Sequence, residues 1–143
     1  MTVSRILAIK GRDVITTQPH RTLAEVAQLL SDKGIGALVV TGAAGEVMGI
    51  VSERDVVRAV ARQGAVALED AVSRHMTARV VTAQETATIN GLMQQMTAGR
   101  FRHVPVVEDG RLVGLISIGD VVKHRLEEYE HEQQALKDYI ATA

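Results

Sequence analysis

A short motif that occurs twice carries the polar side chains best suited to hold a ligand. It reads Gly-apolar-apolar-Ser-x-x-Asp and spans residues 49–55 and 114–120. We expect the serine to end a strand and the aspartate to lie in the first turn of the next helix, where free backbone N–H groups and a partial positive charge favour a phosphate. A serine hydroxyl can donate to a phosphate or ribose oxygen, and an ionised aspartate can accept from the paired hydroxyls of a ribose. The candidate residues are Ser52, Asp55, Ser117 and Asp120.

Three basic residues in or near these motifs are candidates for binding phosphate. Arg54 lies inside the first motif, and Arg102 and His103 precede a predicted strand in the second half of the chain. The equivalent positions of the first half are Gly36 and Ala37, which carry no charge. Each candidate has an alternative without a ligand. Ser-x-x-Asp can simply cap a helix, the arginine can be a solvated surface residue, and the histidine can be satisfied by backbone at a strand edge.

The motifs belong to a longer internal repeat. Residues 14–16 (Val-Ile-Thr) resemble residues 80–82 (Val-Val-Thr). Two β-rich runs then occur at residues 37–41 and 47–52, and their counterparts at residues 103–107 and 112–117. Between the first segment and these runs, each copy has apolar residues at the spacing of an amphipathic helix. These are Leu23, Val26, Ala27 and Leu30 in one copy and Ile89, Leu92, Met93 and Met96 in the other.

Each copy therefore predicts a β-α-β-β-α unit, and the fold class is α/β. A unit of this size is too small to bury its helices well alone, so we expect the two units to pack sheet against sheet with pseudo-two-fold symmetry. The predicted organisation is a first repeat at 8–64, a linker at 65–78 with a short helix around Leu68 to Val72, and a second repeat at 79–126. A C-terminal helical tail follows at 127–143.

The tail has a heptad pattern of its own. Its apolar positions alternate in steps of four and three, with one polar interruption at Gln133. This pattern fits a helix docked along its own domain and fits a contact with a second copy or a partner equally well. His124 and His131 are a heptad apart, which does not suit a helical metal pair, and no metal site is predicted. The apolar positions with the interruption are Val122, Leu126, Tyr129, Gln133, Leu136 and Ile140.

Composition excludes several function classes. The 143 residues are 46% hydrophobic, carry a formal net charge of −1 and include only one Phe, two Tyr and no Trp. A general nucleic-acid binder needs a basic face or stacking aromatics, so we expect no nucleic acid as partner. The absence of Cys excludes disulfides and thiolate chemistry. No apolar run is long enough to cross a bilayer and no signal peptide is recognisable, so we expect no membrane association and a cytoplasmic location.

These features resemble a tandem pair of CBS (cystathionine-β-synthase) domains, known as a Bateman module. The resemblance rests on the repeat, on both Ser-x-x-Asp motifs and on the sequence Arg102-His-Val-Pro-Val106, and it covers about residues 8 to 126. It is that of a stand-alone CBS pair of bacterial type. Members of this family bind AMP, ADP, ATP, NAD(H) or S-adenosylmethionine between the two repeats. The resemblance thus implies an adenine nucleotide as bound ligand and no catalytic cofactor.

The resemblance also implies a role for each candidate residue. Asp55 and Asp120 would hold ribose hydroxyls, with Ser52 and Ser117 beside ribose or phosphate. The phosphates would be held by Arg54, Arg102 and His103. Residues flanking adenine would be Ile15, Thr16, Val81 and Thr82, with Ala37 and Leu38 or Val104 and Pro105 opposite. The second motif departs from the first, because Ile118 and Gly119 replace Glu53 and Arg54.

The predicted function is a sensor that binds an adenine nucleotide and regulates a partner or acts as a homodimer. No nucleophile triad, metal motif, P-loop or dinucleotide fingerprint is visible, so we predict that it is not an enzyme. Two alternatives remain: an interaction protein with empty pockets, or slow hydrolysis of a nucleotide by His103 with Asp120. Family resemblance suggests a flat homodimer formed through the helices, using apolar positions at Val56, Val57, Val60, Val121 and Val122.

Overall fold

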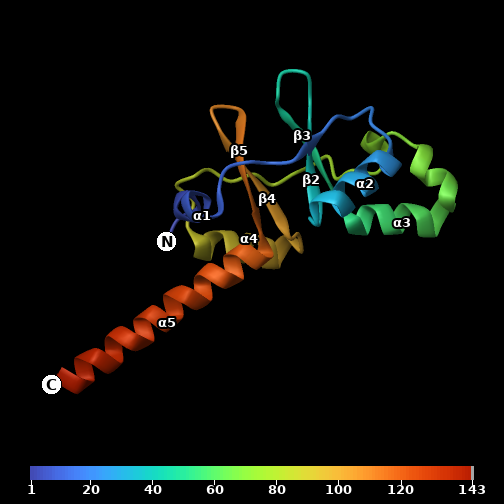
Figure 1. The fold of residues 1–143 in the computed structure, drawn as a ribbon. Helices are drawn as coiled ribbons and strands as arrows, with labels where there is room; N and C mark the ends of the chain where they lie inside the picture. Colours follow the sequence, from blue (N-terminus) through green and yellow to red (C-terminus); the bar gives the residue numbers. More distant parts are fainter. Residues whose placement is uncertain (143) are drawn as a thin grey trace.

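The computed structural model describes residues 1–142 and shows two similar halves side by side (Figure 1). The first half contains β1 (Thr16–Thr17), α2 (Leu23–Lys33), β2 (Ala37–Thr41), β3 (Val47–Ser52) and α3 (Glu53–Gln63). β1 pairs with β2 in parallel and β2 pairs with β3 antiparallel, which gives a three-stranded sheet. The predicted β-α-β-β-α order is therefore confirmed for this half.

The second half repeats this order with one difference. It contains α4 (Ile89–Gly99), β4 (His103–Glu108), β5 (Arg111–Ser117) and α5 (Ile118–Thr142), but its sheet has two strands. The prediction of a strand at residues 80–82 is wrong. An isolated bridge between Ala83 and Val106 follows directly after these residues. Pro105 explains the difference, because it occupies the place of Val39, whose amide donates to the Ile15 carbonyl in the first half. Proline has no N–H to donate, so the extra ladder bond is lost.

Helices α2 and α4, one in each half, begin with equivalent side-chain caps. Thr22 Oγ1 accepts from the amide of Glu25 at the start of α2, and Thr88 Oγ1 accepts from the amide of Gly91 at the start of α4. The amphipathic stripes predicted for these helices form the buried faces: Leu23, Val26 and Leu30 in α2, and Ile89, Leu92 and Met96 in α4. A cap of this kind contributes about 1 kcal/mol to helix stability.

The two halves exchange the segments that precede them. Helix α1 (Val3–Lys10), which the sequence patterns did not predict, packs Val3, Ile6 and Leu7 into the core of the second half. The linker forms two 3₁₀ helices, η1 (Ala65–Glu69) and η2 (Val72–Arg74), and packs Ala67 and Val72 into the core of the first half. The prediction of a single short helix around Leu68 to Val72 is thus wrong. Two 3₁₀ helices stand there instead, and they overlap the two ends of that range.

The glycine that opens each motif makes this exchange possible. A Cβ at Gly49 would lie 2.7 Å from the Thr77 carbonyl oxygen and 2.8 Å from Met76 Sδ. A Cβ at Gly114 would lie 2.6 Å from Leu7 Cδ2. Both contacts are closer than packed atoms allow, so each strand needs a residue without a side chain where the exchanged segment crosses it.

A third apolar cluster joins the two sheets. Ala37, Val39 and Ile50 of the first half are buried, and Val80, Leu112 and Leu115 of the second half pack against them. Backbone bonds recur at equivalent places: Glu53 N donates to the Gly36 carbonyl (3.0 Å) and Ile118 N to the Arg102 carbonyl (2.8 Å). The expected packing of sheet against sheet is confirmed, and these equivalent bonds fit the expected pseudo-two-fold relation.

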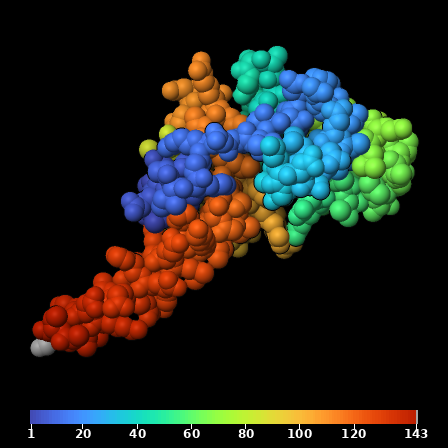
Figure 2. Space-filling view, viewed as in Figure 1, coloured from blue at the N-terminus to red at the C-terminus, as the bar shows by residue number. Residues whose placement is uncertain are grey.

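Helix α5 is one continuous helix that leaves the body of the molecule (Figures 1 and 2). Its first turns are anchored, since Val121 and His124 are buried, whereas Leu126 and residues 129–142 are exposed. Of the two interpretations of the tail, docking along its own domain is therefore wrong for residues 129–142, and a contact with a second copy or a partner stays a prediction. Val121 belongs to the core of the second half rather than to an external apolar face. Among residues 1–142 no helix has the length and apolarity needed to span a membrane.

Candidate functional site

A cleft of about 540 Å³ lies between the two halves and takes side chains from both. The end of β3 and the start of α3 form one wall, and the end of the linker together with the loop between α4 and β4 forms the other. Its lining residues are Gly36, Ile50, Ser52, Glu53, Arg54, Asp55, Arg58, Thr77, Arg79, Val80, Val81, Gly99, Arg100, Phe101, Arg102, His103 and Ile118. A volume of this size is typical of a site for a small organic ligand.

Ser52 and Asp55 form a capping box at the head of α3. Ser52 N donates to Asp55 Oδ2 at 2.8 Å, and Asp55 N donates to Ser52 Oγ at 3.4 Å. The capping interpretation of the motif is therefore correct as local structure. It does not consume the whole carboxylate: within residues 1–142, Oδ2 accepts the hydrogen bonds from Ser52, and Oδ1 accepts none and lies 3.8 Å from Arg58 Nη1. One oxygen positions the helix, and the other is available to a ligand in the cleft.

The cleft is strongly cationic. Five arginines and one histidine line it, against two acids, Glu53 and Asp55. The arginines come from three separate places: α3, the end of the linker, and the loop between α4 and β4. Guanidinium groups stay charged at any physiological pH and suit phosphate oxygens through paired hydrogen bonds. The five are Arg54, Arg58, Arg79, Arg100 and Arg102.

His103 is the one cleft side chain with an ordinary pKa near neutrality, and its surroundings keep it neutral. Burial lowers the pKa of His103 below 6.5, and the charges of Lys10 and Arg102 lower it further. The carboxylates of Asp120 and Glu53 oppose this effect and do not overcome it. At pH 7 the imidazole is therefore mostly uncharged, able to donate one hydrogen bond and accept another.

The second motif has the same cap but different surroundings. Ser117 N donates to Asp120 Oδ2 at 2.9 Å, and Asp120 N donates to Ser117 Oγ at 3.1 Å. Lys10 Nζ donates to the same carboxylate oxygen at 2.6 Å and to the Leu115 carbonyl at 2.7 Å. Burial alone raises the pKa of Asp120, but the hydrogen bonds from Lys10 and Ser117 outweigh it and hold the pKa below 3.8. Asp120 is thus held by an internal cation and does not line the cleft.

Comparison with known proteins identifies the family of this chain. Residues 5–62 and residues 70–127 each match the family model of the CBS domain. The chain belongs to the CBS-domain family. It is 31% identical, over 97% of its length and 71% of the relative's, to the mitochondrial CBS domain-containing protein CBSX3 of Arabidopsis thaliana. The crystal structure of the CBS-domain protein ATU1752 of Agrobacterium tumefaciens is 54% identical, with a TM-score of 0.85 over 87% of this chain and 99% of that one.

Two other solved CBS pairs carry adenosine compounds. PAE2072 of Pyrobaculum aerophilum, complexed with AMP, is 29% identical with a TM-score of 0.75 over 84% of this chain and 89% of that one. The CBS pair of protein MJ0100, in complex with 5′-methylthioadenosine and S-adenosyl-L-methionine, is 25% identical with a TM-score of 0.80 over 90% of this chain and 98% of that one. The fold of this CBS pair is therefore one on which related proteins hold adenosine derivatives.

The cleft of this CBS pair brings together six of the residues proposed from its sequence, and nine lie elsewhere. Leu38 and Val104 are fully buried in the cores of their own halves, and Ala37 and Pro105 are buried in their strands. Ile15 packs against the first core, and Thr82 is exposed outside the cleft lining. Thr16, Ser117 and Asp120 do not line it either. The six in the cleft are Ser52, Arg54, Asp55, Val81, Arg102 and His103.

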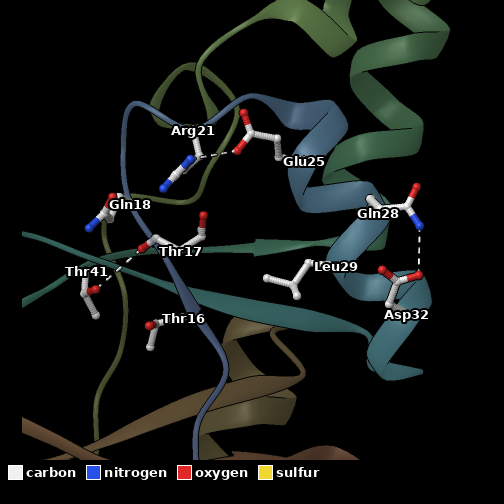
Figure 3. A pocket seen from close by; sticks show the side chains of 9 residues that line it. All are labelled: Thr16, Thr17, Gln18, Arg21, Glu25, Gln28, Leu29, Asp32 and Thr41. Atoms are coloured by element: carbon white, nitrogen blue, oxygen red, sulfur yellow. Dashed lines mark hydrogen bonds and ion pairs between the residues drawn. The ribbon is translucent and has the colours of Figure 1, made fainter.

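Thr16 instead lines a second, more open pocket of about 560 Å³ on the outside of the first half (Figure 3). Its three charged side chains all have partners within the pocket: Arg21 donates to Glu25 at 3.3 Å, and the amide of Gln28 donates to Asp32 at 2.8 Å. All of its lining residues come from one CBS repeat. With its polar groups paired and no excess of positive charge, this pocket suits a phosphate-bearing ligand less well than the cleft between the repeats.

Three of the cleft arginines were missed from the sequence. Arg58 follows Arg54 by one helical turn, so the same face of α3 carries both, and this spacing was a usable signal. Arg100 caps α4 in a left-handed conformation with φ of 55°, and Arg79 directly follows the exchanged linker. Neither has a local pattern that marks it as a binding residue. Only the packing of the two repeats brings them beside Asp55.

Proposed function

We propose that this CBS pair binds an adenine nucleotide in the cleft beside Asp55 and acts as a regulatory module rather than as an enzyme. The observation that carries the proposal is the convergence of five arginines and His103 on a motif whose aspartate has a carboxylate oxygen to spare. The AMP complex of the related protein PAE2072 supports it. Phosphates require cations, and this cleft supplies them from both repeats.

Within the cleft, the groups are divided in a way that suits the parts of a nucleotide. Asp55 Oδ1 would accept from a ribose hydroxyl, while Oδ2 continues to cap α3. Ile50, Val80 and Val81 provide apolar lining for adenine. The arginines would receive the phosphates. The roles of Ser52, Arg54, Arg102 and His103 remain as the sequence predicts, and Arg58, Arg79 and Arg100 join them.

The charge of the cleft also selects among adenosine compounds. S-adenosylmethionine carries a positive sulfonium at the position where AMP carries its phosphate. Five arginines would repel the first and attract the second. We therefore expect AMP, ADP, ATP or NAD(H) to bind here in preference to S-adenosylmethionine or 5′-methylthioadenosine.

A ligand in this cleft would contact both repeats at once, which suits regulation. Arg54 and Asp55 belong to the first repeat, whereas Arg102 and His103 belong to the second. A nucleotide would neutralise the mutual repulsion of the arginines and favour the arrangement in which they converge. It would thereby shift the population of repeat-to-repeat arrangements, which a partner surface can detect.

Calorimetric titration with a panel of ligands tests the proposal. AMP should bind at least about tenfold more tightly than adenosine or S-adenosylmethionine, because one charge-assisted hydrogen bond contributes about 1.5–3 kcal/mol. Product analysis after incubation with ATP or NADH should show no turnover. Equal affinity for AMP and adenosine would disprove the phosphate site, and accumulation of ADP or AMP would show an enzyme instead.

Arg102→Ala sharpens this test. The variant should lose roughly tenfold in affinity for AMP and almost nothing for adenosine, because only AMP offers a phosphate to the guanidinium. The matched control is Arg62→Ala, which removes an exposed arginine of α3 that does not line the cleft. An equal loss for both ligands would mean that Arg102 supports the fold and not the phosphate.

A further inference from the structure

Helix α5 carries a line of exposed apolar side chains beyond the CBS repeats. The family match ends at residue 127, while the helix continues to Thr142 as a rod that projects from the body (Figures 1 and 2). Leu126, Tyr129, Leu136 and Ile140 are 56%, 53%, 59% and 65% exposed. Together with Val122 and Gln133 they lie on one stripe, which we call the α5 seam. An unpaired apolar stripe of this length on a single helix favours burial against another surface.

The α5 seam is not on the face by which the helix is anchored to its own repeat. Val121 and His124 are buried and Glu128 is partly buried, and Glu128 Oε1 lies 3.1 Å from the N-terminal ammonium of Met1. Successive residues of a helix are about 100° apart. The anchored face and the seam therefore point in directions roughly a third of a turn apart. A second helix could lie along the seam without displacing the body of the protein.

Charged residues flank the seam in a pattern that identifies its partner. With Leu126, Gln133 and Ile140 at heptad position a, position e holds Lys123, Glu130 and Lys137, and position g holds Arg125, Glu132 and Tyr139. In a parallel pair of identical helices, each g residue faces the e residue five positions later on the other helix. Arg125 then faces Glu130, and Glu132 faces Lys137. Every charged pair is of opposite sign.

We propose that α5 is a dimerisation helix, which pairs in parallel and in register with α5 of a second copy of this chain. The parallel orientation is inferred from the charge pairs that an antiparallel dimer would form. An antiparallel pair that also covers all six seam positions would place Lys123 opposite Lys137, Glu130 opposite Glu130 and Glu132 opposite Glu132. Like charges in those positions disfavour that arrangement.

Gln133 adds to the case for parallel pairing. It is the one polar residue of the seam, and in the monomer its amide donates to the Tyr129 hydroxyl at 2.9 Å. In the parallel dimer the two Gln133 side chains would face each other and could exchange hydrogen bonds. In the antiparallel arrangement each would face Tyr129 of the other helix. A single polar residue at position a is a known means of fixing register and orientation.

The absence of cysteine from the sequence allows a direct test by single-cysteine cross-linking of the full chain. Gln133→Cys should form a disulfide-linked dimer on mild oxidation, and Gln134→Cys, its matched control on the outer face, should not. Ile140→Cys reports orientation. It should cross-link in the parallel dimer, whereas the fully overlapped antiparallel dimer would separate the two copies of residue 140 by about 27 Å along the axis.

The three variants decide the proposal. Cross-linking at 133 and 140, but not at 134, supports it. No more cross-linking at 133 than at 134 overturns it and leaves the seam for a different partner. Cross-linking at 133 without cross-linking at 140 overturns the parallel arrangement.

Charge reversal gives an independent measurement. Lys137→Glu or Glu132→Lys alone should weaken dimerisation roughly 5- to 30-fold by sedimentation, and the double variant should restore it. Variants that retain wild-type cross-linking and affinity would show that these charges do not set the pairing, which contradicts the proposed register.

Discussion

The two Ser-x-x-Asp motifs of this CBS pair are locally almost identical and differ in everything around them. In both, the aspartate accepts from the serine amide, at 2.8 Å in one and 2.9 Å in the other. Asp55 opens on a cleft lined by five arginines, while Asp120 is bonded to Lys10. The motif alone therefore specifies a helix cap. Whether the cap also becomes a ligand site depends on side chains that other segments bring to it.

The exchanged segments bring different residues to equivalent places. Helix α1 crosses β5 and ends in Lys10, which reaches the second motif. The segment that crosses β3 has Met76 at the equivalent position, and Met76 packs on Gly49 without offering a charge. Gly119 and Gly36 stand where the other copy has Arg54 and Arg102. In one half the motif aspartate is thus paired with an internal lysine, whereas in the other it faces the arginine-lined cleft.

The largest predicted effect is on AMP affinity, when the two motif aspartates are substituted in turn. Asp55→Asn should weaken AMP binding roughly 10- to 100-fold, because a hydrogen bond from ribose to a charged acceptor is lost. Asp120→Asn, the matched control, should change the affinity by less than about threefold. Each aspartate stands at the third helical position, where the asparagine amide oxygen can still accept from the serine amide, so both variants should stay folded. Calorimetry gives the affinities and circular dichroism the fold.

A result of equal losses would contradict this asymmetry. It would mean that Asp120 exchanges Lys10 for a ligand and that both motifs bind nucleotide. A stoichiometry of two nucleotides per chain in the wild-type protein would accompany that outcome, whereas the proposed single cleft requires one.

How much of this comparison could be predicted from the sequence depends on the range of the interactions involved. The repeat, both caps and the seam of α5 follow from local spacing, and they stand in the structure. Helix α1 escaped notice because its three buried residues, Val3, Ile6 and Leu7, form a stripe too short to distinguish from a strand or loop. The weakened strand before Ala83 had a signal in Pro105 that the repeat comparison overlooked.

The same distinction between local and long-range interactions applies to the residues proposed to bind the ligand. Ser52 and Asp55 were identified because the first motif contains them. Arg102 and His103 were identified because they are basic residues directly before a predicted strand of the second repeat. Leu38 and Val104 were placed near adenine by resemblance, but their strands are covered on both faces and their side chains enter the cores. Arg79 lines the cleft together with residues of the other repeat, and Lys10 bonds to Asp120 of the other repeat. Their roles depend on which segment crosses which strand, and no pattern within one repeat encodes that.

Lys10→Met offers a moderate test of the comparison, since it gives α1 the residue that stands in the other exchanged segment. The ion pair is partly exposed, with 35% and 22% of the two side chains accessible, so its loss should cost only about 0.5–1 kcal/mol of stability. The pKa of Asp120 should rise, because burial then acts with less opposition. Denaturant unfolding at several pH values measures both effects.

The sign of the pH effect follows from linkage. The folded-state pKa of Asp120 lies below 3.8, so its contribution to stability is present above pH 3.8 and is lost as the pH falls through the folded pKa. In Lys10→Met that contribution shrinks, and the variant should lose less stability than wild type on acidification through this range. A variant with unchanged acid sensitivity would show that Lys10 does not stabilise the Asp120 carboxylate.

The smallest predicted effect concerns His103, which belongs to the second repeat and lines the cleft between the repeats. Because its pKa is lowered by burial and by Lys10 and Arg102, against Asp120 and Glu53, it is already mostly neutral above pH 6.5. AMP affinity should therefore change less than about threefold between pH 8 and 6.5. Below pH 6.5, protonated His103 should strengthen binding, while protonation of the phosphate, with a second pKa near 6, limits the gain.

Titration of AMP at stepped pH values measures this pH dependence, with His103→Gln as the control that lacks the histidine contribution. Lys10→Met should move the onset to higher pH by removing a positive charge near His103. If wild-type affinity rises steeply between pH 8 and 6.5 and His103→Gln abolishes the rise, His103 is charged near neutrality, and the influence of Lys10 on the cleft is weaker than the structure indicates.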